Sequence, residues 1–107
     1  MAAKARILAI DDQLYFRNFL LSLLSEEGYE VVAAPAGASA REALEQRGPF
    51  DLAITDLPGP GRPAADWVAT LREVAPELEV VVVTGVGDVA TSVAAMQQGA
   101  SDFLLKP

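Results

Sequence analysis

The chain has 107 residues, with eight basic and fifteen acidic side chains and a net charge of −7. This length suits one domain, and a hydrophobic fraction of 51% is enough for a buried core. With no cysteine and no histidine, the sequence excludes disulfides, thiolate catalysis, a Ser-His-Asp triad and zinc sites built from these residues. So acidic a surface repels phosphate backbones and anionic lipid, which argues against direct nucleic-acid or membrane binding by this segment. No apolar run approaches a signal peptide or a membrane span, and a cytoplasmic location is expected.

Short apolar runs alternate along the chain with segments of helical periodicity. The first helix is predicted to stop at Gly28, the last at Gly99, and the segment 57–63 is a loop by its proline and glycine content. In chain order, the predicted elements are strand 7–10, helix 14–27, strand 30–34, helix 38–47, strand 52–55, helix 63–75, strand 80–83, helix 89–98 and strand 103–105.

This alternation predicts an α/β fold in which a single domain spans residues 1–107. The strands are apolar on both faces, as in a parallel sheet that is covered by helices and joined by right-handed crossovers. We expect a doubly wound, flavodoxin-like sheet of five strands in the order 2-1-3-4-5.

Reactive side chains follow four of the five predicted strands. Asp11 and Asp12 follow the first, Asp56 the third, Thr84 ends the fourth, and Lys106 follows the fifth. Ligands of open parallel sheets bind outside the carboxyl ends of the strands, where strand order reverses. In the predicted order the second strand lies at an edge, so the other four ends would converge on one cleft.

These residue types suit phosphoryl transfer with the help of a metal ion. Three neighbouring carboxylates repel one another unless a cation lies between them, and an all-oxygen ligand set favours Mg²⁺, with Mn²⁺ as the alternative. A carboxylate such as Asp56 can then attack phosphorus, while the Lys106 ammonium and the Thr84 hydroxyl contact the phosphoryl oxygens. Gly85 leaves room for the incoming group.

Each residue has a plainer explanation when it is taken alone. Asp11 and Asp12 could cap the following helix, Asp56 could be a turn residue, Thr84 a strand end and Lys106 a solvated lysine. The plainer explanation requires four coincidences at equivalent strand ends, so the functional interpretation is preferred.

The segments 7–12, 51–56, 82–85 and 99–107 together resemble the receiver domains of two-component response regulators. The resemblance covers essentially the whole chain and implies a phosphoacceptor protein that is not an enzyme with an external substrate. The stretch 84–90 is most similar to receivers attached to transcription regulators of the nitrogen-regulation or nitrogen-fixation type.

Carried over to this sequence, the resemblance makes Asp56 the phosphoacceptor and a metal ligand. Asp12 would bind the metal directly, Asp11 through water, and Pro58 through its backbone carbonyl. Lys106 would contact the phosphoryl group.

The resemblance also implies a conformational switch. Thr84 and Gly85 would contact the phosphoryl group, and Thr84 would move together with the ring of Phe103. The Lys106–Pro107 peptide bond is expected to be cis.

Departures from the family pattern affect the loop and the end of the chain. Pro58 and Val86 stand where polar residues often orient a hydrolytic water, so slow self-dephosphorylation is expected. Phe103 replaces the commoner tyrosine. The fifth helix of a receiver is missing after Pro107, so we expect a C-terminally truncated domain that exposes apolar side chains beside the first helix.

The implied partners are a sensor histidine kinase or phosphotransfer protein and an output domain or partner on the face formed by the fourth helix and fifth strand. A homodimer is a further expectation. Two alternatives stay open: a pseudo-receiver that binds partners without phosphorylation, and an aspartate-based phosphatase. A nucleotide-binding oxidoreductase is disfavoured because no glycine-rich turn follows the first strand.

Overall fold

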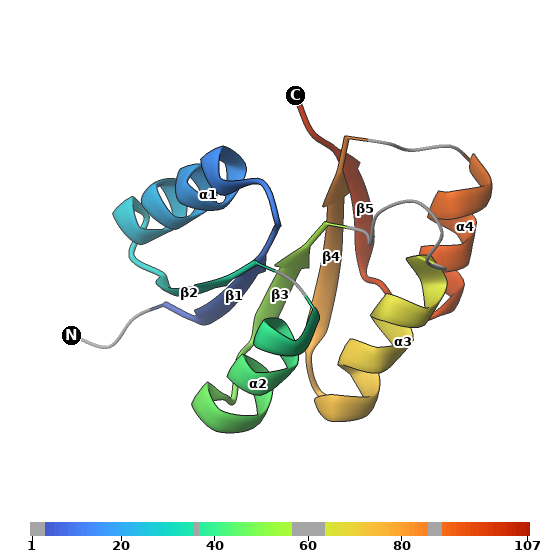
Figure 1. Ribbon diagram of the computed structural model, residues 1–107, viewed down its shortest axis with the longest axis horizontal. Coiled ribbons are helices and arrows are strands. Elements are labelled where there is room, and N and C mark those ends of the chain that lie inside the picture. Colours follow the sequence, from blue (N-terminus) through green and yellow to red (C-terminus); the bar gives the residue numbers. More distant parts are fainter. Residues whose placement is uncertain (1–3, 36, 57–63, 86–88) are drawn as a thin grey trace.

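The computed structural model describes residues 4–35, 37–56, 64–85 and 89–107 (Figure 1). Strands and helices alternate strictly along the chain. None of the helices in these ranges is long and apolar enough to cross a membrane. The elements are β1 (Arg6–Ile10), α1 (Leu14–Glu26), β2 (Glu30–Ala34), α2 (Gly37–Arg47), β3 (Leu52–Thr55), α3 (Ala64–Val74), β4 (Glu79–Thr84), α4 (Val89–Gln97) and β5 (Asp102–Leu105).

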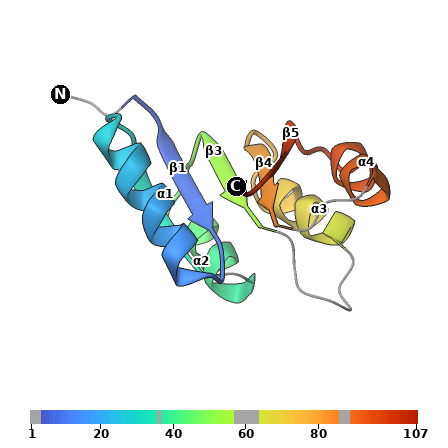
Figure 2. The same ribbon diagram turned by 90° about the horizontal axis from the view of Figure 1, so that it is seen from above.

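The strands form one parallel sheet in the order β2-β1-β3-β4-β5, which confirms the predicted topology. In this order β1 and β3 are neighbours, and their partners place Ile10 beside Thr55 at the carboxyl ends. The two edges of the sheet have different helical neighbours. The helix α1 lies by β1 and β2, whereas α3 and α4 lie by β4 and β5 (Figure 2).

Glycines end the first and last helices where the sequence predicts. Gly28 has φ +94° and Gly99 has φ +110°, a left-handed conformation that favours glycine. The residue after each glycine donates its N–H to a carbonyl five positions back, that of Leu24 in α1 and that of Ala95 in α4. These bonds satisfy carbonyls at the helix end and turn the chain back toward the sheet.

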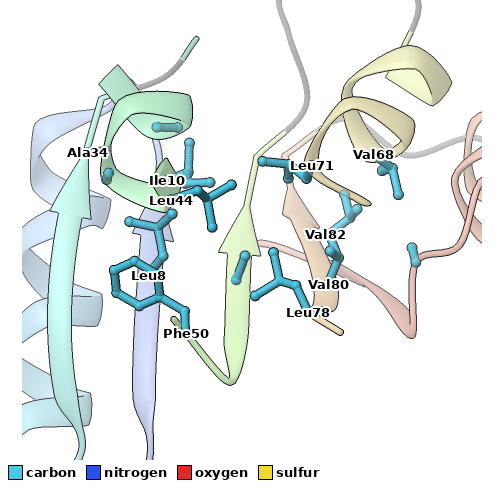
Figure 3. Close-up of a cluster of buried hydrophobic side chains, with 14 of the residues drawn as sticks. Leu8, Ile10, Ala34, Leu44, Phe50, Val68, Leu71, Leu78, Val80 and Val82 are labelled. Atoms are coloured by element: carbon cyan, nitrogen blue, oxygen red, sulfur yellow. The ribbon is translucent and has the colours of Figure 1, made fainter. Parts of the chain in front are cut away.

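One face of the sheet carries most of the buried core. Alternate strand residues such as Leu8, Ile10, Val80 and Val82 point to this face, where α2, α3 and α4 cover them (Figure 3). Among the described side chains of these helices, the buried ones are Ala40, Ala43, Leu44, Val68, Leu71 and Ala95. In α4, Val93 and Met96 are apolar and at helical spacing, yet both are exposed.

The opposite face is covered by α1 over part of its width. Ala9, Phe16 and Leu20 form the buried cluster there. Toward β5 the cover ends, and Leu104 is 49% exposed. Within the described ranges no second helix lies on this side, which agrees with the expected apolar exposure beside the first helix.

One backbone expectation is wrong. The bond between Lys106 and Pro107 is trans, and the cis bond of the described residues is Gly48–Pro49. Trans is the intrinsic preference of an X–Pro bond, and Pro107 is exposed.

At the amino end of the sheet, the side chain of Arg6 ties β1 to the α2–β3 connection. One terminal nitrogen donates to the carbonyls of Arg47 and Pro49, each at 2.7 Å. Nε donates to Glu30, and the guanidinium carbon lies 4.7 Å from the centre of the Phe50 ring. Arg6 thus joins three segments that are distant in sequence.

Candidate functional site

The hydrogen-bond pattern of the parallel sheet continues beyond the last residues of the strands to the backbone N–H groups of predicted site residues. The N–H of Asp56 donates to the carbonyl of Ile10 at 3.0 Å, and that of Lys106 donates to Thr84 at 2.8 Å. The N–H of Asp11 bonds in the same way to β2. The sheet itself therefore fixes where these side chains begin.

Strand alternation sends three of the site residues to the same side of the sheet. Asp11 is two residues beyond Ala9, and Asp56 two beyond Ile54, both of which belong to the α1 face. Lys106 stands in the same relation to Leu104. The three side chains therefore extend over the start of α1, at the carboxyl ends of β1, β3 and β5.

The Lys106 ammonium joins the two carboxylates. Its Nζ lies 2.8 Å from Asp11 Oδ2 and 3.0 Å from Asp56 Oδ2. The side chains of Asp11 and Lys106 are only 1% and 7% exposed, so water screens this pair little. Burial lowers the pKa of Lys106, but hydrogen bonds and charge attraction from Asp11 and Asp56 outweigh it and raise the pKa above its ordinary value. The ammonium is therefore charged at neutral pH.

Two further contacts of the ammonium were not predicted from the sequence. Gln13 Oε1 accepts a hydrogen bond from Lys106 Nζ at 2.7 Å. The ring of Phe16, in α1, has its centre 4.6 Å from the same nitrogen, which is within the range of a cation–π contact. The position of Gln13 directly after Asp12 is the one sequence signal that could have drawn attention to it.

Asp11, Asp12 and Asp56 can each offer a carboxylate oxygen such that all three atoms lie within 4.8 Å of one another. Apart from the Lys106 ammonium, the buried Asp11 Oδ2 has no hydrogen-bonding neighbour among the described residues. An all-oxygen set with one buried and one exposed acid fits a hard divalent cation that keeps several waters. The described residues therefore fit such an ion.

The backbone of the two buried strand ends is held by side chains that the sequence did not single out for this role. Trp67 of α3 donates its indole N–H to the hydroxyl of Thr55 at 2.8 Å, and that hydroxyl lies 2.8 Å from the Asp56 carbonyl, to which it donates. Arg17 of α1 donates to the carbonyl of Asp11 at 3.0 Å. These bonds restrain the acids from the side of the main chain.

The remaining predicted residues lie at different depths around the cluster. Thr84 is buried at the end of β4, on the face opposite to Asp56, and Phe103 packs partly buried against the larger core on that same face. Gly85 is exposed, and no described atom lies within 4 Å of a Cβ built there. Pro58 lies outside the described residues.

Comparison of the chain with known proteins identifies a family that is consistent with this geometry. The sequence profile of the response regulator receiver domain matches residues 7–107. This chain is a response regulator receiver domain. It therefore belongs to two-component signalling, and its flavodoxin-like fold is that of the family.

Individual proteins support the same assignment. The chain is 41% identical over 104 residues to the alginate biosynthesis transcriptional regulatory protein AlgB of Pseudomonas aeruginosa, covering 97% of this chain and 23% of AlgB. A response regulator of Burkholderia pseudomallei, solved with a phosphorylated aspartic acid, calcium ion and citrate, has a TM-score of 0.86 at 29% identity over 95% of this chain and 59% of that one.

A third protein is the beryllofluoride-activated NtrC4 receiver domain, solved as a dimer in solution. It has a TM-score of 0.84 at 31% identity, over 95% of this chain and 84% of that one. The receiver domain thus spans only about a quarter of a curated relative such as AlgB. Receiver domains of this kind work with histidine kinases and output domains.

Proposed function

We propose that this receiver domain accepts a phosphoryl group on Asp56 from a sensor histidine kinase or a phosphotransfer protein. The observation that carries the proposal is the Lys106 ammonium, placed 3.0 Å from Asp56 Oδ2 and 2.8 Å from Asp11 Oδ2. A cation in this position faces the oxygen that becomes bonded to phosphorus. The calcium ion and phosphorylated aspartate of the Burkholderia protein belong to a domain of the same fold.

The reaction needs a nucleophile and the neutralisation of charge. An oxygen of the Asp56 carboxylate attacks the phosphorus of a phosphohistidine, a P–O bond forms, and the P–N bond breaks with its electron pair left on the imidazole nitrogen. Lys106 then binds an oxygen of the phosphoryl group in place of Asp56 Oδ2. The main-chain bonds around Asp56 keep its carboxylate in position during the transfer.

Asp11, Asp12 and Asp56, with the backbone carbonyl of Pro58, would hold Mg²⁺ or, alternatively, Mn²⁺. When bound, the ion would neutralise part of the negative charge on the equatorial oxygens of the transferred group. Asp12 is the exposed acid of the set and Asp11 the buried one. In this proposal Asp12 binds the ion directly and Asp11 binds it through water.

The proposed switch links Thr84 to Phe103. On adjacent strands Thr84 is paired with Leu105 and Phe103 with Val82, so the two side chains are diagonal neighbours on one face. The Thr84 hydroxyl would turn toward the phosphoryl group, which Gly85 would also contact. The Phe103 ring would then move into the space that the Thr84 side chain leaves. The altered face of α4 and β5 would then report phosphorylation to an output domain.

The output is proposed to be transcriptional, because AlgB and other relatives are transcriptional regulatory proteins. We further propose that the chain is one domain of a longer regulator, whose next segment forms the fifth helix over Leu104. Homodimer formation, as in the NtrC4 receiver, is a related proposal. A cytoplasmic location stays a prediction.

The test is phosphorylation in vitro. The chain is incubated with Mg²⁺ and acetyl phosphate, and intact mass spectrometry is expected to show the addition of one HPO₃. The Asp56→Asn variant should not gain it, whereas Asp102→Asn, which alters an exposed aspartate of β5, should. An unmodified wild-type chain would favour the pseudo-receiver, and steady turnover of acetyl phosphate would favour the phosphatase.

The same experiment measures the lifetime of the phosphoryl group. After removal of acetyl phosphate, the phosphorylated form should persist far beyond seconds, because Pro58 and Val86 have no polar side chain to orient a water. Loss of the added mass within seconds would contradict this expectation.

A further inference from the structure

The Lys106 ammonium contacts three side-chain oxygens in the described structure. It donates hydrogen bonds to Gln13 Oε1 at 2.7 Å and to Asp56 Oδ2 at 3.0 Å, and it is ion-paired with Asp11 Oδ2 at 2.8 Å. An ammonium has three N–H donors. A further oxygen partner would therefore have to displace one of these three.

Gln13 is itself anchored to the acid cluster. Its backbone N–H donates to Asp11 Oδ1 at 2.8 Å, and it directly precedes α1. Its side chain makes no capping hydrogen bond to that helix. The amide oxygen is thereby available to bind Lys106, which lies 93 residues later in the chain.

The ammonium and a divalent cation would compete for the same carboxylates. Asp11 Oδ2 is buried and in contact with Lys106, and it belongs to a carboxylate of the three-acid cluster. Two cations on adjacent carboxylate oxygens repel each other, and the repulsion is strong where water is excluded. Binding of a divalent ion by the cluster should therefore weaken the contact between Lys106 and Asp11.

We propose that Gln13 is a positioning residue that holds the Lys106 ammonium on Asp11 and Asp56 and so lowers the affinity of the acid cluster for a divalent cation. The inference rests on the proposed function, since it concerns the same acids. Gln13 acts without a charge of its own, because its neutral amide stabilises the metal-free arrangement only through the hydrogen bond to Lys106.

The first test is a Mg²⁺ titration of the Gln13→Met variant, which keeps the side-chain length but lacks the acceptor. Trp67 is the only tryptophan and is hydrogen-bonded through Thr55 to the Asp56 carbonyl, so its emission can report binding. The Kd for Mg²⁺ should fall about three- to tenfold, less than a fully buried hydrogen bond to a charge would give, because Gln13 is exposed. An unchanged or higher Kd would overturn the proposal.

The second test asks whether Gln13 acts through Lys106. In a Lys106→Met background, the Gln13→Met substitution should leave the Kd for Mg²⁺ unchanged. If the Kd for Mg²⁺ still falls by about three- to tenfold without the lysine, Gln13 influences the cluster by another route and the proposal is wrong.

NMR gives a readout that does not depend on affinity. In the metal-free wild-type chain, the ε-methylene protons of Lys106 should be shifted by the ring current of Phe16. Addition of Mg²⁺ should reduce this shift, and Gln13→Met should reduce it without Mg²⁺. A full ring-current shift in the metal-free variant would show that Gln13 does not hold the ammonium.

The results separate the two proposals. If the wild-type chain is phosphorylated on Asp56 while Gln13→Met leaves the Kd unaltered, only the role of Gln13 fails. If the wild-type chain binds no Mg²⁺ at all, both proposals fail.

Discussion

The two ends of the sheet each hold a cation near two carboxylates, but by different means. At the amino end, Arg6 is paired with Glu30 and its backbone N–H donates to Asp51, while its guanidinium is fixed on two main-chain carbonyls. At the carboxyl end, the Lys106 ammonium has only side-chain oxygens as polar partners among the described residues, those of Asp11, Asp56 and Gln13.

The difference lies in what can move. A planar guanidinium that bridges main-chain carbonyls cannot leave without opening the connection between α2 and β3, so Arg6 is a structural cation. An ammonium on a flexible stem can exchange one side-chain acceptor for another at little cost to the backbone. The same type of charge pair thus stabilises the fold at one end and remains available for chemistry at the other.

The strongest test of this contrast is Lys106→Met. Removing the cation from the proposed phosphoryl site should slow phosphorylation by acetyl phosphate about a hundredfold, as for loss of one preorganised electrostatic contact. The rate is followed by intact mass at saturating Mg²⁺. Lys4→Met, which removes an exposed lysine at the amino end, is the matched control and should react at the wild-type rate. Equal rates for the two variants would mean that Lys106 takes no part in the reaction.

Arg6→Met should show the reverse behaviour. It removes two hydrogen bonds to main-chain carbonyls and the pair with Glu30, so the free energy of unfolding should fall by about 1 to 2 kcal/mol, since the site is partly exposed. Urea denaturation measures the change, and the phosphorylation rate should stay as in the wild type.

Arg41 provides the control for Arg6, because it forms an exposed ion pair with Glu45, which lies one helical turn later in α2. Arg41→Met should change stability by no more than about 0.5 kcal/mol. If the two arginine variants lost the same stability, the contacts of Arg6 with the main chain would not matter.

The smallest expected effect is the pH dependence of the Lys106 pair. Its pKa in the folded chain is raised above the ordinary 10.5, so the folded state holds the proton more tightly than the unfolded state. The resulting stability is complete below the unfolded pKa and is lost as pH rises through the folded one. With a chelator present, the difference in urea midpoint between wild type and Lys106→Met should therefore stay constant from neutral pH to about 10 and shrink above it. A decrease already near neutral pH would indicate a lowered pKa instead.

The sequence predicted the order of elements and the place of the charged residues because both depend on local patterns. Apolar runs that stop at Asp11 and Asp56 identify strand ends, and a parallel sheet brings such ends to one edge. Gly28 and Gly99 identify helix ends because the left-handed conformation favours glycine. None of these inferences needed knowledge of a distant contact.

What the sequence did not predict depends on side chains that are far apart in the chain. The hydrogen bond between Gln13 and Lys106 joins the two ends of the chain, and the one from Trp67 to Thr55 joins a helix to a strand.

Val93 and Met96 are apolar at helical spacing yet exposed, since a repeating pattern indicates a helix without fixing how deeply it packs. The trans bond before Pro107 shows that a family habit need not appear in this chain.

The hydrogen bonds that lead from the sheet to Asp56 and Lys106 also have a consequence for misfolding. Slipping one strand by a single residue would turn its apolar side chains toward water and send its terminal charge to the wrong side of the sheet. The error that exposes the apolar side chains also separates Asp56 from Lys106. A misassembled copy of this domain would thus lack the pair on which the proposed phosphorylation depends.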